Sequence, residues 1–311
     1  MKIFYHRQFN IDFGFFNFLH PFDGVKFRRV FDEIKALPGI EIVVPAQAMP
    51  LLTIQKYADR VISNLYQSKQ YILRALELPQ IPLLPFSFLD RKILLPMRWG
   101  VATTMEAARL ALTGINCWNL AGGYHHASRA SCEGFCIYND INLAVNELRE
   151  EGKINTSTRV LIIDVDAHHG NGNANVFRED AAITILDQFN DDIYPRNNYT
   201  KQRIDIALPV HCNIDGQTYL QTLRAGLQRL REKVAQDGSF ALAFVIAGTD
   251  VLIMDQLGRM NLSIEECIER DVLILDTLKE LAIPCVVLGG GGYSKDSALA
   301  IAGSIKRLYR Y

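Results

Sequence analysis

The sequence has almost no excess of charge of either sign. Its 311 residues include 33 lysines and arginines and 34 aspartates and glutamates, for a formal net charge of −1. Proteins that bind nucleic acid independently of base sequence rely on a strongly basic surface. The composition therefore excludes an overall attraction to nucleic acid and leaves open only a local basic patch, so we expect no direct nucleic-acid partner.

Long apolar runs and cysteines are also scarce. No stretch approaches the roughly 18 consecutive apolar residues of a membrane helix, and His6, Arg7 and Asp12 interrupt the N-terminal segment, unlike the apolar core of a signal peptide. Six cysteines in 311 residues form neither the dense framework of a small secreted domain nor a paired CxxC zinc site. We therefore expect a cytoplasmic protein without a membrane span.

What the sequence does contain is an alternation of short apolar runs and longer helical segments. The apolar runs predict buried strands at residues 3–5, 40–44, 117–120, 160–164, 182–186, 204–208, 241–246 and 284–288. Helical periodicity marks segments such as 139–151, 217–236, 264–282 and 295–309. Strands that are apolar on both faces and alternate with helices are typical of a parallel sheet covered on both sides. We predict one α/β domain over residues 1–311, a three-layer α/β/α arrangement with a mostly parallel central sheet.

The segment LIIDVDAHHGNGN, residues 161–173, places polar side chains directly after one of these runs. Asp164, Asp166 and His168 are spaced i, i+2 and i+4, so an extended chain would point all three to the same side. They lie at the carboxyl end of a strand, where open α/β sheets bind ligands. Carboxylates this close repel each other unless a cation or a proton intervenes, which favours a metal site.

Asp250 follows another apolar run in the same manner and completes an Asp-His-Asp set with Asp166 and His168. Three protein ligands with an open position are typical of a catalytic metal site, and this oxygen-rich set suits Zn, Fe(II), Co or Mn. The alternative is that the aspartates cap helices or form turns and that the histidine is a hydrogen-bonded polar residue.

Two further clusters follow predicted strands. AGGYHHASRASCEGFC, residues 121–136, contains the adjacent His125 and His126, and neutral imidazole is well matched to proton transfer near pH 7. CVVLGGGGYSKD, residues 285–296, fits neither phosphate-binding glycine motif, but its Tyr293 hydroxyl can donate a hydrogen bond to an oxyanion. Taken singly, the paired histidines can be structural and the tyrosine a packing residue.

Together these clusters resemble the zinc-dependent histone deacetylase superfamily, which has the arginase-deacetylase fold. The resemblance rests on GGYHHASRASCEGFC, DVDAHHGNGN, AGTD and GGGGY, in this order. Further matches resemble its class IV branch: LHPFDGVKF at 19–27, RKILLPMR at 91–98, ILDQFNDDIYP at 185–195 and TDVLIMDQLGRMNLS at 249–263. The resemblance covers nearly the whole chain and implies a metal-dependent amidohydrolase that removes acetyl or longer fatty acyl groups from lysine side chains.

The resemblance also implies roles for the matching residues. These are the metal ligands Asp166, His168 and Asp250, the catalytic residues His125, His126, Asp164, Asn171 and Tyr293, and the substrate-tunnel residues Gly134, Phe135, Tyr194 and Leu257. The implied cofactors are Zn²⁺, with Fe²⁺ as an alternative, and a structural K⁺ or Na⁺ held around Asp164, Asp166, His168 and Asp187. Asn171 departs from the branch that has Asp at this position and agrees with the branches that have Asn.

Several alternatives stay open at this point. The partner is an acylated lysine in a peptide or protein, or a small acylated amine such as an acetylpolyamine. The same fold supports ureohydrolases with two Mn ions, which require additional carboxylates in the metal loops, and a metal-containing module that binds acyl-lysine without hydrolysing it is the non-enzymatic alternative. The sequence does not assign the acid and base roles to the two histidines, nor does it indicate an oligomeric state.

Overall fold

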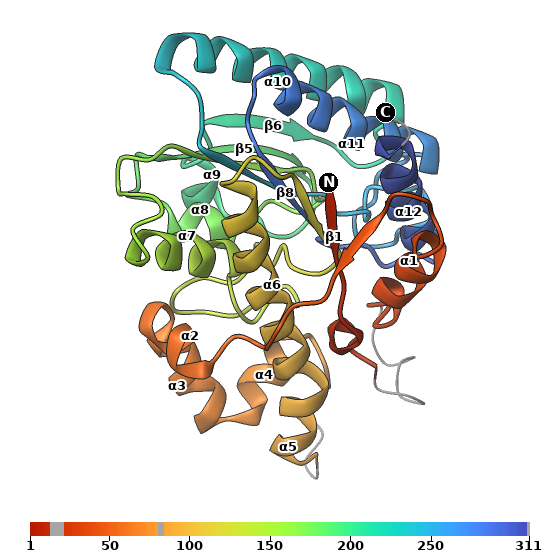
Figure 1. Ribbon diagram of the computed structural model, residues 1–311. Helices are drawn as coiled ribbons and strands as arrows, with labels where there is room; N and C mark the ends of the chain where they lie inside the picture. Colours follow the sequence, from red (N-terminus) through yellow and green to blue (C-terminus); the bar gives the residue numbers. More distant parts are fainter. Residues whose placement is uncertain (13–21, 80–83, 310–311) are drawn as a thin grey trace.

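The computed structural model describes residues 1–12, 22–79 and 84–309. Within them, eight strands form one sheet in the order β2-β1-β3-β8-β7-β4-β5-β6, and every pairing is parallel (Figure 1). The strands are β1 (Lys2–Phe4), β2 (Glu41–Val43), β3 (Cys117–Asn119), β4 (Val160–Asp164), β5 (Ile183–Asn190), β6 (Ile206–Val210), β7 (Leu242–Ile246) and β8 (Cys285–Leu288). Each predicted apolar run coincides with one of them, which confirms the predicted parallel sheet.

Two strands differ from their predicted bounds by more than one residue. β5 continues to Asn190 instead of ending at residue 186, because Asp187, Gln188 and Asn190 are buried and find hydrogen-bond partners inside the protein. Apolar periodicity cannot detect a strand that contains paired polar residues. β6 begins at Ile206 and ends at Val210, two residues later than predicted.

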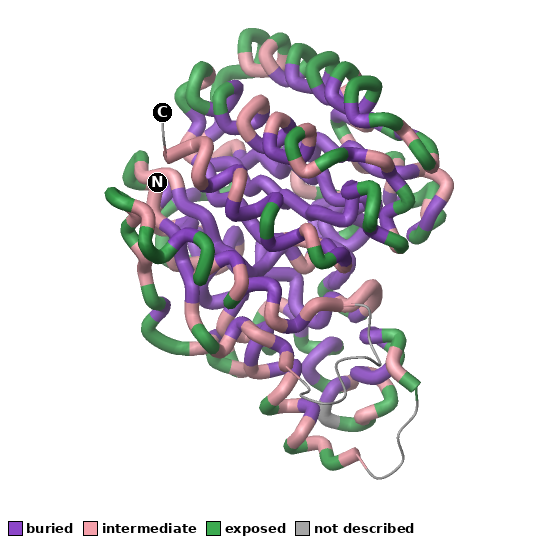
Figure 2. The backbone as a smooth tube through the Cα atoms, turned by 90° about the vertical axis from the view of Figure 1, so that its right-hand side faces the viewer, coloured by how far each residue is buried: buried purple, intermediate pink, exposed green. Residues whose placement is uncertain are grey.

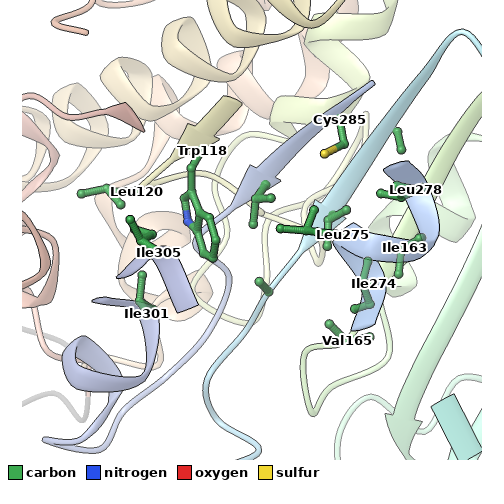
Figure 3. Close-up of a cluster of buried hydrophobic side chains, with 14 of the residues drawn as sticks. Trp118, Leu120, Ile163, Val165, Ile274, Leu275, Leu278, Cys285, Ile301 and Ile305 are labelled. Atoms are coloured by element: carbon green, nitrogen blue, oxygen red, sulfur yellow. The ribbon is translucent and has the colours of Figure 1, made fainter. Parts of the chain in front are cut away.

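Successive strand residues face opposite sides of the sheet and pack into two separate cores. One core holds Trp118, Ile163, Val245 and Val287, and the other holds their chain neighbours, among them Cys117, Ile162, Phe244 and Val286. In the first core, Trp118 and Ile163 lie near Leu275 and Ile301 from the covering helices (Figure 3). Because side chains on both faces of these strands are buried in apolar cores, the strand sequences are continuously apolar.

Helices cover both faces of the sheet. One face is covered by α1 (Lys26–Ile34), α10 (Gly216–Asp237), α11 (Ile264–Glu280) and α12 (Ser297–Leu308), and the other by α6 (Leu95–Ala111), α7 (Asp140–Glu150) and α8 (Asn171–Val176). The buried strands lie at the centre and the exposed residues concentrate on the outer sides of the helices (Figure 2). The predicted α/β/α layers are confirmed, and α7, α10, α11 and α12 correspond to the predicted helical segments.

A group of short helices extends from the sheet at the bottom of Figure 1. It comprises α2 (Leu51–Tyr57), α3 (Asp59–Gln67), α4 (Lys69–Ala75), α5 (Phe86–Leu89) and the π-helical turn η3 (Asp90–Leu94), which leads into α6. Its side chains form a third apolar cluster together with side chains of α6, α7 and the segment 132–138. Short single turns, η1 (Arg7–Phe9) and α9 (Asn198–Lys201), complete the described structure. Among the described helices, none combines the length and apolar character needed to cross a bilayer.

The parallel arrangement brings the carboxyl ends of the central strands to one level. Asp164 at the end of β4 is in register with Ile246 at the end of β7, and Ile246 is in register with Leu288 at the end of β8. Leu288 in turn pairs with Asn119, the last residue of β3. The loops that follow these four strands therefore leave the sheet side by side, and they contain the clusters singled out in the sequence.

Candidate metal and catalytic site

Asp166, His168 and Asp250 form a buried cluster beyond the ends of β4 and β7. One potential ligand atom from each residue lies within 4.8 Å of the others. The His168 Nδ1 lies 3.1 Å from Asp166 Oδ1 and 2.7 Å from Asp250 Oδ2, so the three donors converge on one point. The remaining carboxylate oxygens are held by main-chain amides, since Gly291 N donates to Asp166 Oδ2 and Ala167 N donates to Asp250 Oδ1.

The electrostatics of this cluster favour a bound cation. Burial and the adjacent Asp166 charge raise the pKa of Asp250 to about 7. Burial alone would lower the pKa of His168, but its hydrogen bonds to Asp166 and Asp250 raise it to about 10. Two buried carboxylates at this separation need positive charge between them, and the donor set of two carboxylates and one imidazole suits a divalent transition metal.

The local conformation differs from the one the sequence suggested. β4 ends at Asp164, and residues 166–168 form a bend instead of continuing as extended chain. As a result Asp166 and His168 belong to the metal cluster, whereas Asp164 Oδ2 accepts a hydrogen bond from His125 Nδ1 at 2.8 Å. Asp164, Asp166 and His168 are close together, but their side chains do not line one side of an extended strand.

His125 and His126 lie beside the metal cluster with different partners. His125 donates to the Asp164 carboxylate, and its Nε2 is 3.7 Å from Asp166 Oδ1. His126 Nδ1 donates to the side-chain carbonyl of Asn171 at 2.6 Å. The two rings are 4.1 Å apart between centroids and both are buried. The structure therefore pairs His125 with Asp164 and His126 with Asn171, which brings four of the predicted catalytic residues together.

The two glycine-rich loops approach each other backbone to backbone. Gly123 and Gly290 both have positive φ, and a Cβ atom on Gly123 would lie 2.9 Å from Gly290 N. Gly290 N donates to Gly122 O, which joins the tandem-histidine loop to the loop that carries Tyr293. Only glycine combines this conformation with so close an approach. The four glycines thus serve loop packing at the site rather than phosphate binding.

Tyr293 lies at the end of this loop, close to the metal cluster. Its ring packs edge-on against Phe22 and Phe135, with centroids 6.3 and 5.6 Å away. Burial and the nearby Asp166 and Asp250 carboxylates raise its pKa well above the ordinary value of 10, so the side chain remains a neutral hydrogen-bond donor.

An apolar cavity adjoins the histidines and Tyr293. Its lining includes Gly134 and Phe135 together with apolar side chains from the N-terminal part of the chain, namely Ile11, Phe22, Leu76, Leu78, Ile93 and Met97. Tyr194 stands at the edge of the site, 42% exposed, with its ring 5.2 Å from that of His126. Leu257 lies in the loop after β7 and does not line this cavity. Three of the four predicted tunnel residues are thus in contact with the cavity or with His126.

Asp187 lies in β5 next to the loop that follows β4, where the family resemblance implies a monovalent cation. Its Oδ2 accepts hydrogen bonds from His169 Nδ1 and Gly170 N. Its Oδ1 is buried without a hydrogen-bond partner. A buried, unpaired carboxylate oxygen fits a cation ligand.

Sequence reasoning assigned no role to three residues that order the site loops. Asp255 accepts hydrogen bonds from Tyr293 N and Leu257 N, and Asp140 accepts from Gly123 N and Tyr124 N. Lys26 is buried and donates to carbonyls of the Gly-rich loop. Asp255 and Lys26 fall within the quoted motifs, but neither motif indicates a partner; residues 19–21 of the first motif lie outside the described residues.

Comparison with known proteins gives one consistent result. Residues 55–307 match the family model described as the histone deacetylase domain. Histone deacetylase 2 of Arabidopsis thaliana is 32% identical over 313 residues, covering 100% of this chain and 79% of that protein. An uncharacterized protein of Picosynechococcus sp. is 34% identical over 216 residues, covering 67% of this chain and 68% of that protein.

Two solved structures have the same fold. The HDA15 HD domain superposes with a TM-score of 0.77 at 18% identity, covering 100% of this chain and 91% of that one. An HDAC homolog complexed with SAHA superposes with a TM-score of 0.75 at 21% identity, covering 99% of this chain and 82% of that one. At these identities the likeness supports the fold alone.

Proposed function

The chain belongs to the histone deacetylase family, and we propose that it hydrolyses the amide bond between an acyl group and the side-chain nitrogen of lysine. As a member of this family it is a hydrolase that acts on amide bonds. The observation that carries the proposal is that two histidines with different partners and Tyr293 line one apolar cavity beside the Asp166-His168-Asp250 cluster.

Asp166, His168 and Asp250 would hold the metal. Two carboxylates and one imidazole fit Zn²⁺, with Fe²⁺ as the alternative, and three protein ligands leave room for substrate. When bound, the metal supplies Lewis acidity to the amide carbonyl and lowers the pKa of water from about 16 toward about 7. Asp187, with its unpaired Oδ1, would hold the structural K⁺ or Na⁺ together with main-chain carbonyls of the metal loop.

The remaining site residues supply proton transfer and charge stabilisation. His126 has a neutral amide partner at Nδ1, so its Nε2 is suited to accept the proton of the attacking water. His125 has a carboxylate partner, Asp164, which stabilises the imidazolium form and suits it to donate a proton to the leaving amine. The Tyr293 hydroxyl donates a hydrogen bond to the carbonyl oxygen as negative charge develops there.

The apolar cavity is suited to the acyl group. Leu76, Leu78, Ile93 and Met97 are among its lining residues, and an apolar lining of this extent suits an acyl chain longer than a two-carbon acetyl group. We therefore propose that the enzyme accepts acyl chains longer than acetyl. The class IV motifs support this assignment, and Tyr194 with Phe135 would contact the lysine stem at the mouth of the site.

The proposal is tested with a series of lysine peptides carrying acetyl, butyryl, octanoyl and myristoyl groups, with the zinc-loaded protein and with a chelator present. We expect chelator-sensitive release that is faster for the longer chains. Release confined to acetyl would overturn the assignment of the cavity to longer acyl chains. Release from an acetylated polyamine but from no peptide would show that the substrate is a small acylated amine. Binding of the peptides without any release would favour a non-catalytic acyl-lysine module.

A further inference from the structure

Glu133 occupies a tight turn that lies against the catalytic histidine. Cys136 N donates to Glu133 O at 2.9 Å, and the two residues between them, Gly134 and Phe135, both have positive φ. A Cβ atom on Gly134 would lie 2.3 Å from His126 Cδ2, so the turn packs directly on the imidazole. The family resemblance implies a role for Gly134 and Phe135 but none for Glu133.

The Glu133 side chain contacts Asn171, the partner of His126. Asn171 Nδ2 donates to Glu133 Oε1 at 2.7 Å, while Asn171 Oδ1 accepts from His126 Nδ1 at 2.6 Å. An asparagine amide has one donor end and one acceptor end, whereas an ionised glutamate only accepts. Glu133 therefore determines which end of the amide faces the histidine.

This orientation sets the position of a proton on His126. A carbonyl oxygen at Nδ1 requires that Nδ1 carry the hydrogen, and a neutral imidazole then has a free lone pair at Nε2. If the amide rotated by half a turn, its NH₂ group would face Nδ1 and favour the opposite tautomer. Glu133 also lies beside Tyr194, whose pKa is raised by burial and by the Glu133 carboxylate and whose ring centroid is 5.2 Å from that of His126.

We propose that Glu133 is a positioning residue that, through the Asn171 amide, holds His126 as the tautomer protonated at Nδ1. The use of the free Nε2 as a proton acceptor rests on the proposed function. The tautomer itself does not. Glu133 and Asn171 together take the place of a single carboxylate partner, with the negative charge moved one residue further from the imidazole.

The test separates this role from simple packing by exchanging the carboxylate and the amide group between positions 133 and 171. In Asn171→Asp, the new carboxylate faces Glu133 at hydrogen-bond distance, and we expect kcat to fall about 10-fold or more, since a positioned general base contributes about 10²–10⁴-fold. In the double variant Glu133→Gln with Asn171→Asp, the introduced glutamine amide can donate to one oxygen of the introduced carboxylate and leave the other oxygen for His126. We expect the double variant to recover most of the loss.

A second readout does not depend on turnover. The ring ¹⁵N shifts of histidine in the zinc-loaded protein report which nitrogen carries hydrogen, and His126 is assigned by its loss in His126→Ala. We expect the Nδ1-protonated form in the wild type and in the double variant, and a mixture of tautomers in Glu133→Ala. Glu77→Gln, a change of an exposed acidic residue whose charge also acts on Tyr194, is the matched control and should keep the wild-type spectrum.

Two results would overturn the role of Glu133. One is an unchanged His126 tautomer in Glu133→Ala together with a kcat within about twofold of wild type. The other is a double variant no more active than Asn171→Asp. Absence of hydrolysis by the wild-type protein, with the tautomer changing as expected, would reject the proposed function and leave the positioning role of Glu133 supported.

Discussion

His125 and His126 are adjacent in the chain and each is only 4% exposed, yet their environments differ. Burial lowers the pKa of both rings, but the Asp164 and Asp166 carboxylates raise the pKa of His125 to about 9. Burial and the neighbouring His125 and His168 lower the pKa of His126 well below 6.5. Asp164 lies outside the metal ligand set, so its effect on His125 persists when the metal is bound. Groups whose pKa values are pushed apart in this way are suited to separate acid and base roles.

Tyr293→Phe and Asp166→Ala should both lose activity, but for different reasons. Removing the Tyr293 hydroxyl takes away a donor to the developing oxyanion, and we expect kcat to fall about 10²–10³-fold with unchanged zinc content. Asp166→Ala removes a ligand from the cluster, so we expect loss of bound zinc and of activity together. Kinetics and metal analysis on the same preparations check both outcomes. Equal zinc loss in the two variants would contradict the assigned roles.

Among the structural elements, the loops beyond the strand ends depend on two buried cations. Arg270 of α11 is fully buried, and its Nη1 donates to Val165 O and Gly248 O, which joins the loops after β4 and β7. Its charge is paired with Asp271. Lys26 of α1 is also fully buried and donates to carbonyls of the Gly-rich loop after β8. The helices on one face of the sheet thus hold the loops that carry all three proposed metal ligands and Tyr293.

We expect Lys26→Met to weaken the Gly-rich loop. Methionine has a similar length but leaves the carbonyls of Gly290 and Gly292 without their donor, at a cost of about 1–3 kcal/mol for each buried unpaired group, whereas Gly291 O keeps its hydrogen bond from Thr249 N. The free energy of unfolding, measured with denaturant, should fall by about 2–4 kcal/mol, and kcat should fall because Tyr293 is less well placed.

Lys35→Met is the matched control for this prediction. Lys35 lies just after α1, is exposed, and pairs with Asp32 on the surface, with its Nζ 5.8 Å from the centroid of the Phe31 ring. A surface ion pair contributes about 0–1 kcal/mol, so this variant should remain within about 1 kcal/mol of wild type and keep its kcat. Comparable destabilisation of both variants would show that the contact of Lys26 with the loop is not what stabilises it.

Across the whole molecule, the site is assembled from loops that follow four strands of one sheet. His125, Asp166, Asp250 and Tyr293 come from different loops, and the in-register ends of β3, β4, β7 and β8 bring these loops together. A metal that binds Asp166, His168 and Asp250 therefore joins the loops after β4 and β7. Because an unfolded chain does not hold these ligands together, metal binding contributes directly to the stability of the folded state.

We expect removal of zinc to lower Tm, and restored zinc to raise it again. A ligand that binds only the folded state stabilises it by about 4 kcal/mol when its free concentration is about 1,000 times Kd. Thermal unfolding followed by circular dichroism, with and without chelator, measures the effect. Asp166→Ala should show no response to zinc. A wild-type Tm that does not change between the zinc-bound and zinc-free forms would contradict a site that joins two loops.

Much of the fold could be predicted from the sequence because the signals are local. Central strands such as β4 are buried on both faces, so Ile162 and Ile163, which face opposite cores, are both apolar. α11 begins at a capping box in which Ser263 and Glu266 bond each other's main-chain amides, a pattern confined to four consecutive residues. The extension of β5 to Asn190 was missed because its polar residues are paired by distant parts of the chain.

The sequence by itself determined the order of strands and helices and the types of residue that gather at the strand ends, since both follow from periodicity and spacing along the chain. Only the tertiary structure decided that Asp164 serves His125 rather than the metal cluster, that Lys26 reaches Gly291 across 265 positions, and that Glu133 orients Asn171. The physical reason is that a hydrogen bond depends on distance and direction in space. Residues far apart in the chain acquire that geometry only when the sheet has brought their loops together.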